Sequence, residues 1–215
     1  MLTIYAIPPS LYCAKLRILL RHKSLDWREL PPPGGYGSAA YQQVVPSGNL
    51  PAMLDGDLLL ADGEAIAEYL EERHPAPPML PRVLADRAKM RERGRFHDTR
   101  LEPALRALFG SIAPERRDSA LNARQSAILS EKLGQLARML ETGPALPFGL
   151  GDCGYPITFA WIDALTLPLS LNVAWPEPVV AYRARIEAEP AVAAELASYR
   201  PILEGWVQRT AGTVA

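Results

Sequence analysis

The chain has 215 residues, and its 23 basic and 24 acidic side chains give a formal net charge of −1. This balance leaves no general positive field for nucleic acid or an anionic membrane, so we expect neither as a partner. No apolar run approaches the roughly 18 residues of a membrane span, and the N-terminus lacks a signal-peptide pattern, so we expect a cytoplasmic protein. The two cysteines, Cys13 and Cys153, lie far apart without metal-ligand spacing, which predicts neither a disulfide scaffold nor a metal site.

The first third of the chain alternates strand and helix patterns. Apolar alternation between turn residues predicts four strands, at 3–6, 27–30, 52–54 and 58–61. The last two are expected to form a hairpin around Gly56. Apolar residues at helical spacing predict a helix over 11–23 and another around Ile66, while the segment 30–38, rich in proline and glycine, is expected to be a loop. This order predicts an α/β domain with a right-handed crossover between the first two strands.

Three short segments of this first part point to a binding pocket. Pro51 opens an apolar strand, and a cis bond before it would turn the backbone N–H and C=O of Leu50 outward, where they can pair with a peptide. Asp62 and Gly63 begin a helix whose unpaired N–H groups favour an anion such as a carboxylate. Ser10 begins another helix shortly after the first strand. Together, these segments predict a pocket for a small anionic peptide that carries a thiol.

A stiff, proline-rich stretch at 74–81 separates this part from the rest of the chain, because it cannot continue a helix. A chain of this length is large for one core, which favours two domains. We therefore expect an α/β domain, a proline-rich linker and an all-helical domain, at 1–77, 78–84 and 85–215.

Beyond the linker, the strand patterns vanish and helical spacing dominates. Apolar residues predict one long helix from Met90 through Leu108 and a second through 129–140. The segment 157–171 is apolar nearly all round, which predicts a helix buried on every side. His97 lies on the apolar face of the first of these helices, which favours a hydrogen-bonded core histidine over a catalytic base.

Taken together, these residues match a known family: the chain resembles a cytosolic glutathione S-transferase along nearly its whole length, in particular a serine-type bacterial member. The shared features are Ser10 and Cys13 in a Ser-x-x-Cys arrangement, Pro51 after the binding segment, and Ala65 followed by Ile66 after an acidic residue. The resemblance implies a thioredoxin-like N-terminal domain followed by an all-α helical bundle, glutathione as the cosubstrate, no metal, and a homodimer.

The resemblance also implies roles for the peptide-binding residues. The backbone of Leu50, before Pro51, pairs with the cysteinyl part of glutathione, and Asn49 reaches the glycyl carboxylate. Asp62 meets the γ-glutamyl ammonium, and the Gly63 N–H meets the γ-glutamyl carboxylate. Gly63 stands where the family usually carries serine. The missing hydrogen bond to a charged group costs roughly 1.5 to 3 kcal/mol, which weakens glutathione binding by one to two orders of magnitude.

By the same resemblance, Ser10 donates its hydroxyl to the glutathione thiolate, and the helix end adds ~0.3 to 1 kcal/mol. A serine at this position is equally suited to be only a helix N-cap. Tyr5 is a second candidate donor, but matching Arg17 to the family's helix arginine puts the tyrosine-type position on Ala6. Cys13 is the redox alternative, since a cysteine beside a helix N-terminus can have a lowered pKa, although it also fits a small buried side chain.

The electrophile is expected in an apolar cleft between the domains, and the candidate residues are Tyr12, Tyr36, Phe109, Phe148 and Trp175. Tyr12 also fits packing in the core of the first domain. The primary hypothesis is a glutathione transferase that adds the thiolate to a small hydrophobic electrophile. Alternatives are a glutathione-dependent isomerase, a thiol-disulfide oxidoreductase that uses Cys13, and a non-catalytic protein-binding module, the last suggested by Gly63.

Overall fold

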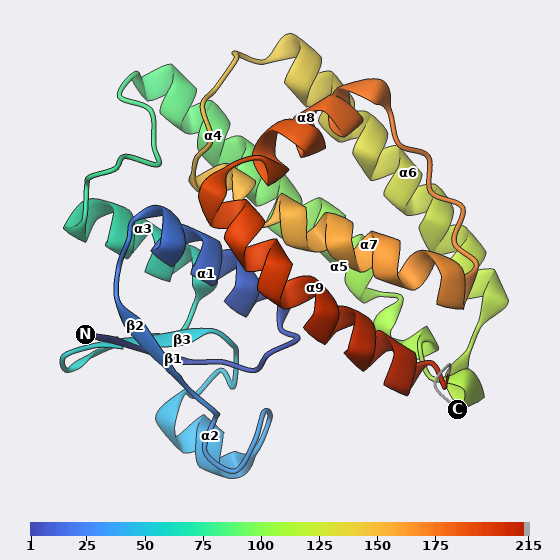
Figure 1. Ribbon diagram of the computed structural model, residues 1–215, viewed down its shortest axis with the longest axis horizontal. Helices are drawn as coiled ribbons and strands as arrows, with labels where there is room; N and C mark the ends of the chain where they lie inside the picture. The colour runs from blue at the N-terminus through green and yellow to red at the C-terminus, as the bar shows by residue number, and fades with distance from the viewer. Residues whose placement is uncertain (213–215) are drawn as a thin grey trace. The chain divides into compact units, whose positions relative to one another are not determined.

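The computed structural model describes residues 1–212 of the chain, which divides into two compact units after Leu80 (Figure 1). The first unit contains strands and helices, and the described part of the second consists of helices and loops. The predicted order of a thioredoxin-like α/β domain followed by an all-α domain is therefore confirmed.

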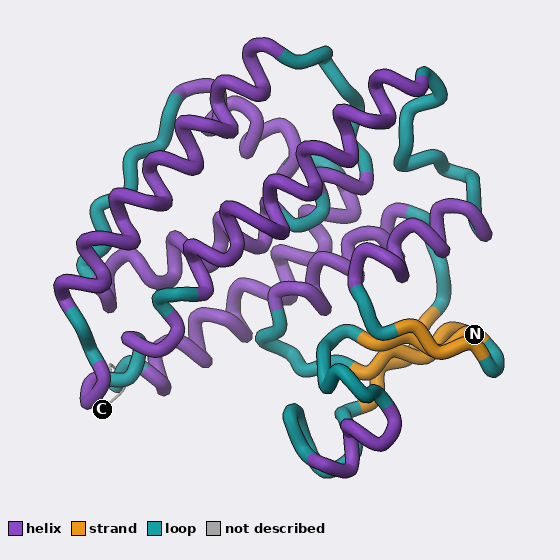
Figure 2. Tube along the Cα trace, turned by 180° about the vertical axis from the view of Figure 1, so that it is seen from behind, coloured by secondary structure: helices purple, strands orange, loops and turns teal. Residues whose placement is uncertain are grey.

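The first unit is built on a mixed four-stranded sheet, which Figure 2 shows in orange. Its elements are β1 (Leu2–Tyr5), α1 (Leu11–His22), β2 (Trp27–Leu30), α2 (Ala39–Val44), β3 (Ala52–Asp55), β4 (Leu58–Leu60) and α3 (Gly63–Arg73). The strand order is β2-β1-β3-β4, with β1 parallel to β2 and antiparallel to β3. Helices α1 and α3 pack against each other, and α2 lies on the other side of the sheet (Figure 1).

Local sequence accounts for most of these elements. The periodic apolar residues of α1, among them Leu16 and Leu19, are buried. Strands β3 and β4 pair Asp55 with Leu58, and Gly56 turns the chain between them with φ of 58°, a left-handed conformation that glycine adopts without strain. The predicted strands and hairpin are confirmed within one or two residues.

Helix α2 is an element that the sequence analysis does not predict. It has six residues, which is too short for a helical apolar period to be recognised. Ser38 caps its start, because the Ser38 Oγ accepts a hydrogen bond from the Tyr41 N–H at 3.1 Å. Tyr41 is fully buried and packs with Val45 and Ala52, so tertiary packing holds this short helix in place.

A buried ionic network explains why the first unit ends at Leu80 and not at residue 77. The Glu71 carboxylate accepts hydrogen bonds from the backbone N–H groups of Met79 and Leu80, each at 3.0 Å. Lys23 pairs with Glu71 at 2.6 Å, and its Nζ also donates to two carbonyl oxygens of the segment 74–77. The first unit therefore includes residues 78–80, which the sequence analysis assigns to the linker.

The second unit is helical throughout its described part. Its helices are α4 (Leu84–Phe96), α5 (Glu102–Arg106), α6 (Ser119–Thr142), α7 (Tyr155–Leu169), α8 (Glu177–Glu187) and α9 (Pro190–Thr210). A π-helical turn (His97–Leu101) and three short 3-10 turns join them, at Phe109–Ser111, Pro114–Arg116 and Leu150–Asp152. Across the described residues, none of the helices has the length and apolarity required to traverse a bilayer.

The helix predicted from Met90 through Leu108 is interrupted. Pro103 has no N–H to donate to the preceding turn, and the π-helical turn, closed by a bond from the Glu102 N–H to the His97 carbonyl, lies directly before it. His97 itself is buried between Thr158, 2.7 Å from Nε2, and Asp98, 2.8 Å from Nδ1. The prediction of a hydrogen-bonded core histidine is confirmed.

The expectation for the apolar segment 157–171 is correct only in part. Helix α7 is buried on every side from Tyr155 to Ile162. Its second half has an exposed face, on which Leu167 is 88% exposed. An apolar side chain does not by itself require a neighbour, because a large share of any protein surface is apolar.

Candidate functional site

The three segments singled out in the sequence converge at one edge of the first unit. Tyr5, at the end of β1, pairs with Ala52 at the start of β3, so the loop leading to Ser10 leaves the sheet beside Pro51. Gly63, the first residue of α3, lies next to Pro51, since a Cβ at Gly63 would be 3.9 Å from the Pro51 Cδ. The starts of α1 and α3 and the start of β3 therefore form one candidate site.

Ser10 is the N-cap of α1. Its Oγ accepts a hydrogen bond from the Cys13 N–H at 3.3 Å, and its own N–H donates to the Ile7 carbonyl at 3.1 Å. A hydroxyl can accept and donate at the same time, so the cap leaves the Ser10 proton for another acceptor. The capping role and the donor role are thus compatible.

Cys13 is a poor candidate for redox chemistry. Its side chain is buried, with 1% of the residue exposed. Burial is the largest influence on its thiol and raises the pKa, although the hydrogen bond with Ser10 acts in the opposite direction. A buried thiol with a raised pKa is a weak nucleophile at neutral pH, which favours the interpretation of Cys13 as a packing residue.

The segment before β3 has the backbone that the sequence analysis expects. The Leu50–Pro51 bond is cis, and Leu50 lies outside the register of β1 and β3, which begins at Ala52. The Tyr41 Oη donates to the Asn49 carbonyl at 2.8 Å and so holds this segment against α2. Burial raises the pKa of Tyr41 to about 12, so the phenol remains a donor at neutral pH. Sequence reasoning missed Tyr41 because it did not predict α2.

The start of α3 keeps one backbone donor available. The Asp62 Oδ1 accepts hydrogen bonds from the N–H groups of Glu64 at 3.0 Å and Ala65 at 2.9 Å, which makes Asp62 the N-cap. Within residues 1–212, the Gly63 N–H has no hydrogen-bond partner. An anion at this helix start would therefore meet the Gly63 N–H and the positive end of the helix dipole.

A partly buried ion pair connects the first turns of the two helices. The Lys15 Nζ of α1 lies 2.9 Å from the Glu64 Oε2 of α3, and the side chains are 7% and 20% exposed. Sequence reasoning named neither residue, because their pairing spans 49 positions and has no local pattern.

Of the predicted electrophile-binding residues, two belong to the first unit. Tyr12 is half-buried, not part of the core, with the Lys15 Nζ 6.0 Å from its ring centroid. Tyr36 lies in the loop before α2 and is 62% exposed. Both rings are therefore open to solvent or to a ligand.

Phe109 and Trp175, in the second unit, pack against different rings of α7. Phe109 stacks on Trp161 with ring centroids 4.6 Å apart, whereas Trp175 packs edge-to-face against Phe159 at 5.2 Å. Residues two positions apart on a helix point in nearly opposite directions, so these contacts lie on opposite sides of α7. The two candidate residues therefore pack on different faces of this helix, and their role toward an electrophile stays a prediction. Phe148 is buried at 7% exposure.

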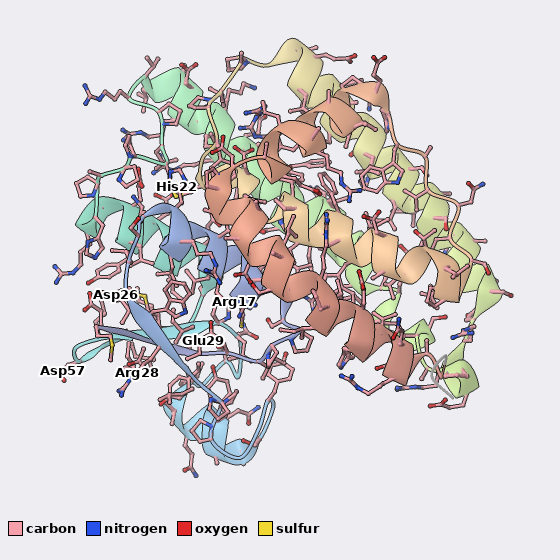
Figure 3. All side chains as sticks on the ribbon, viewed as in Figure 1. Arg17, His22, Asp26, Arg28, Glu29 and Asp57 are labelled. Carbon is pink, nitrogen blue, oxygen red and sulfur yellow. The ribbon has the colours of Figure 1, made fainter. Side chains whose placement is uncertain are left out.

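Further charged residues of the first unit lie on α1, on β2, in the connection between them and in the β3–β4 turn. Figure 3 labels them: Arg17, His22, Asp26, Arg28, Glu29 and Asp57. The Arg17 Nη1 lies 3.4 Å from the Glu29 carboxylate, which joins α1 to β2. Arg28 instead donates to the Thr3 Oγ1 at 2.8 Å. These contacts of Arg17 and Arg28 lie within the first unit, and none of the described residues forms a group of three or more metal-ligating side chains.

The fold defines a class of protein, a thioredoxin-like domain followed by a helical domain, and the candidate site lies at one edge of the first of these. The family model "Glutathione S-transferase, N-terminal domain" matches residues 4–78. The chain is also 30% identical over 174 residues to a stringent starvation protein A homolog from Haemophilus influenzae, in an alignment that covers 74% of each chain. The chain belongs to the glutathione S-transferase superfamily.

Shorter alignments include named enzymes. The chain is 37% identical over 90 residues to glutathione S-transferase Z1 from Arabidopsis thaliana, covering 40% of this chain and 41% of that protein. It is 38% identical over 97 residues to a maleylacetoacetate isomerase from Pseudomonas aeruginosa, covering 42% and 45%. The alignments thus span less than half of these relatives. A solved delta-class glutathione transferase from Nilaparvata lugens shares the fold, with a TM-score of 0.81, 17% identity and 100% of each chain covered.

Proposed function

We propose that the protein is a serine-type glutathione transferase, which stabilises the glutathione thiolate at Ser10 and adds it to a small hydrophobic electrophile. The observation that carries this proposal is the convergence of Ser10, Pro51 and Gly63 at one edge of the first unit. This edge combines a hydroxyl whose proton the helix cap does not require, a backbone segment outside the sheet, and a helix N–H without a partner among the described residues.

In the proposed complex, glutathione runs along the segment before β3. The Leu50 backbone pairs with the cysteinyl residue, and Asn49 reaches the glycyl carboxylate. The Asp62 carboxylate, which caps α3 through Oδ1 alone, meets the γ-glutamyl ammonium. The Gly63 N–H receives the γ-glutamyl carboxylate.

The chemical step needs a thiolate. A free thiol has a pKa near 8.5, so the site has to favour the charged sulfur by one to two pKa units, and the thiol proton leaves to solvent. The Ser10 hydroxyl donates to the sulfur, and the start of α1 adds a favourable field. The thiolate then forms a C–S bond to the electrophilic carbon, and the electron pair leaves with the displaced group or moves onto the acceptor.

A glutathione-dependent isomerase is the second candidate. The 38% sequence identity over 97 residues with a maleylacetoacetate isomerase favours it. In that reaction, the thiolate adds to a double bond, the resulting single bond rotates, and elimination returns the thiolate unchanged. The same Ser10 chemistry serves both reactions, so the acceptor decides between them.

Calorimetric titration with glutathione tests the proposal first, and we expect saturable binding at millimolar concentrations. Activity with an aryl halide would then support the transferase, and isomerisation of a cis-configured unsaturated diacid would support the isomerase. A complete absence of glutathione binding would overturn both enzymes and favour a non-catalytic protein-binding module.

A further inference from the structure

Two lysine–glutamate pairs, one partly buried and one buried, tie α1 and its C-cap to α3, one near each end of the helices. Lys15 pairs with Glu64 at 2.9 Å near the starts of the helices, beside the candidate site. Lys23 pairs with Glu71 at 2.6 Å near the other ends, where it also holds the linker. Both are lysine–glutamate pairs between the same parts of the fold, but the Lys23–Glu71 pair is more buried, carries additional backbone hydrogen bonds and lies far from the candidate site.

The charges at the start of α3 are unfavourable for an anion unless Lys15 is present. Asp62 directly precedes Gly63, and Glu64 directly follows it. Each carboxylate carries a negative charge at neutral pH. The Asp62 carboxylate is engaged as the cap and, in the proposed complex, by an ammonium group. The Glu64 carboxylate would repel an incoming carboxylate, and this repulsion is strong where water is partly excluded.

Lys15 is placed to cancel that repulsion. Its side chain is 7% exposed, and its Nζ contacts the Glu64 carboxylate at hydrogen-bond distance. A buried, charge-assisted pair keeps its geometry better than an exposed one, and salt screens it less. The pair is therefore electrically neutral at the point where the helix start has to accept an anion.

We propose that Lys15 is a specificity-determining residue: by neutralising Glu64, it makes the start of α3 selective for the carboxylate of an acidic γ-glutamyl peptide. This assignment rests on the proposed function. A purely structural ion pair would lose ligand affinity equally when either partner is removed. The assignment instead gives Lys15 a favourable effect and Glu64 an unfavourable effect on ligand affinity.

The test compares glutathione affinity, measured by calorimetry, in Lys15→Met and Glu64→Gln. Lys15→Met uncovers the Glu64 charge, so we expect the Kd to rise about tenfold. Glu64→Gln leaves Lys15 with a neutral partner, so we expect the Kd to stay equal or fall. Lys15→Arg keeps the charge and should retain most of the affinity. The difference between Lys15→Met and the wild type should narrow at high salt.

The matched control is the distant pair, in the variants Lys23→Met and Glu71→Gln. Both should lower the midpoint of urea unfolding without changing the Kd of the folded fraction. If Lys15→Met does not fold, the variants Glu64→Gln and Lys15→Arg still test the assignment. A weaker glutathione affinity in Glu64→Gln would contradict it.

Equal weakening by Lys15→Met and Glu64→Gln would show that the pair is only a structural tie and would overturn the assignment alone. Absence of glutathione binding in the wild type would overturn the proposed function and this assignment with it. The two failures are therefore distinguishable in one set of titrations.

Discussion

The Ser10 hydroxyl can donate one hydrogen bond and accept two, and the backbone of α1 uses one of the acceptor positions. Its oxygen accepts the Cys13 N–H, while its proton is not committed to the cap. The same side chain can therefore begin the helix and stabilise a thiolate, and a serine suits both tasks because its short side chain stays close to the backbone.

Ser10→Ala should lower kcat/KM for conjugation by about 100-fold, because it removes the donor to the sulfur. Cys13→Ala should leave kcat/KM nearly unchanged, because the buried thiol is not the nucleophile. Steady-state kinetics at saturating acceptor measures both. Ser10→Thr keeps the cap and the hydroxyl and serves as the control. The reverse ranking of Ser10→Ala and Cys13→Ala would support a thiol-disulfide oxidoreductase.

Gly63→Ser should tighten glutathione binding by about tenfold, because the new hydroxyl supplies the hydrogen bond that the family's usual serine provides. The structure has room for it, since a Cβ at this position meets Pro51 Cδ at an ordinary van der Waals distance of 3.9 Å. Calorimetric titration gives the Kd directly. Gly63→Ala adds the Cβ without the hydroxyl, and an equal gain in Gly63→Ala would contradict the hydrogen-bond explanation.

At the scale of elements, regular patterns in the sequence predict the sheet, the β3–β4 hairpin and α1, because each depends on local periodicity or a turn residue such as Gly56. The elements that were missed depend on distant contacts. Helix α2 is held by the burial of Tyr41, and the exposed half of α7 reflects which neighbours pack on it. The candidate residues Ser10, Leu50 and Gly63 could be proposed from their local segments, whereas the Lys15–Glu64 pair joins residues far apart in the chain.

Tyr41→Phe tests the link between α2 and the binding segment. Loss of the bond to the Asn49 carbonyl should raise the KM for glutathione about fivefold, with a smaller change in kcat, because the segment is held less firmly. Steady-state kinetics with varied glutathione measures this. Tyr36→Phe, in the exposed loop before α2, is the comparison, and an equal effect in both variants would contradict the role of Tyr41.

The same substitution has a consequence at alkaline pH. With its pKa raised from 10.0 to about 12, folded Tyr41 keeps a proton that the unfolded chain loses, so its contribution to stability is present below pH 10 and lost as the pH rises toward 12. Urea unfolding of wild type and Tyr41→Phe across this interval should show the smaller alkaline loss in the variant. Parallel curves would contradict the shift.

At the scale of the whole molecule, the sequence predicts the order of the two units and their class, because composition and periodicity change at the proline-rich segment. The function of the second unit is less accessible, since Phe109 and Trp175 are placed by helix packing and not by spacing. Which residues meet an electrophile is therefore decided by tertiary structure.

We expect the protein to form a homodimer, as its superfamily suggests. Gel filtration with light scattering at low micromolar concentration should give twice the mass of one chain. A single-chain mass that persists at higher concentration would contradict this expectation.

The anchoring of Met79 and Leu80 by Glu71 has a practical consequence for dissecting the protein. A cut before Met79 would remove the two backbone N–H groups that donate to the buried Glu71 carboxylate, which is paired with Lys23. Chimeras that exchange the helical unit should therefore join the donor sequence after Leu80, so that the hydrogen bonds to Glu71 are kept.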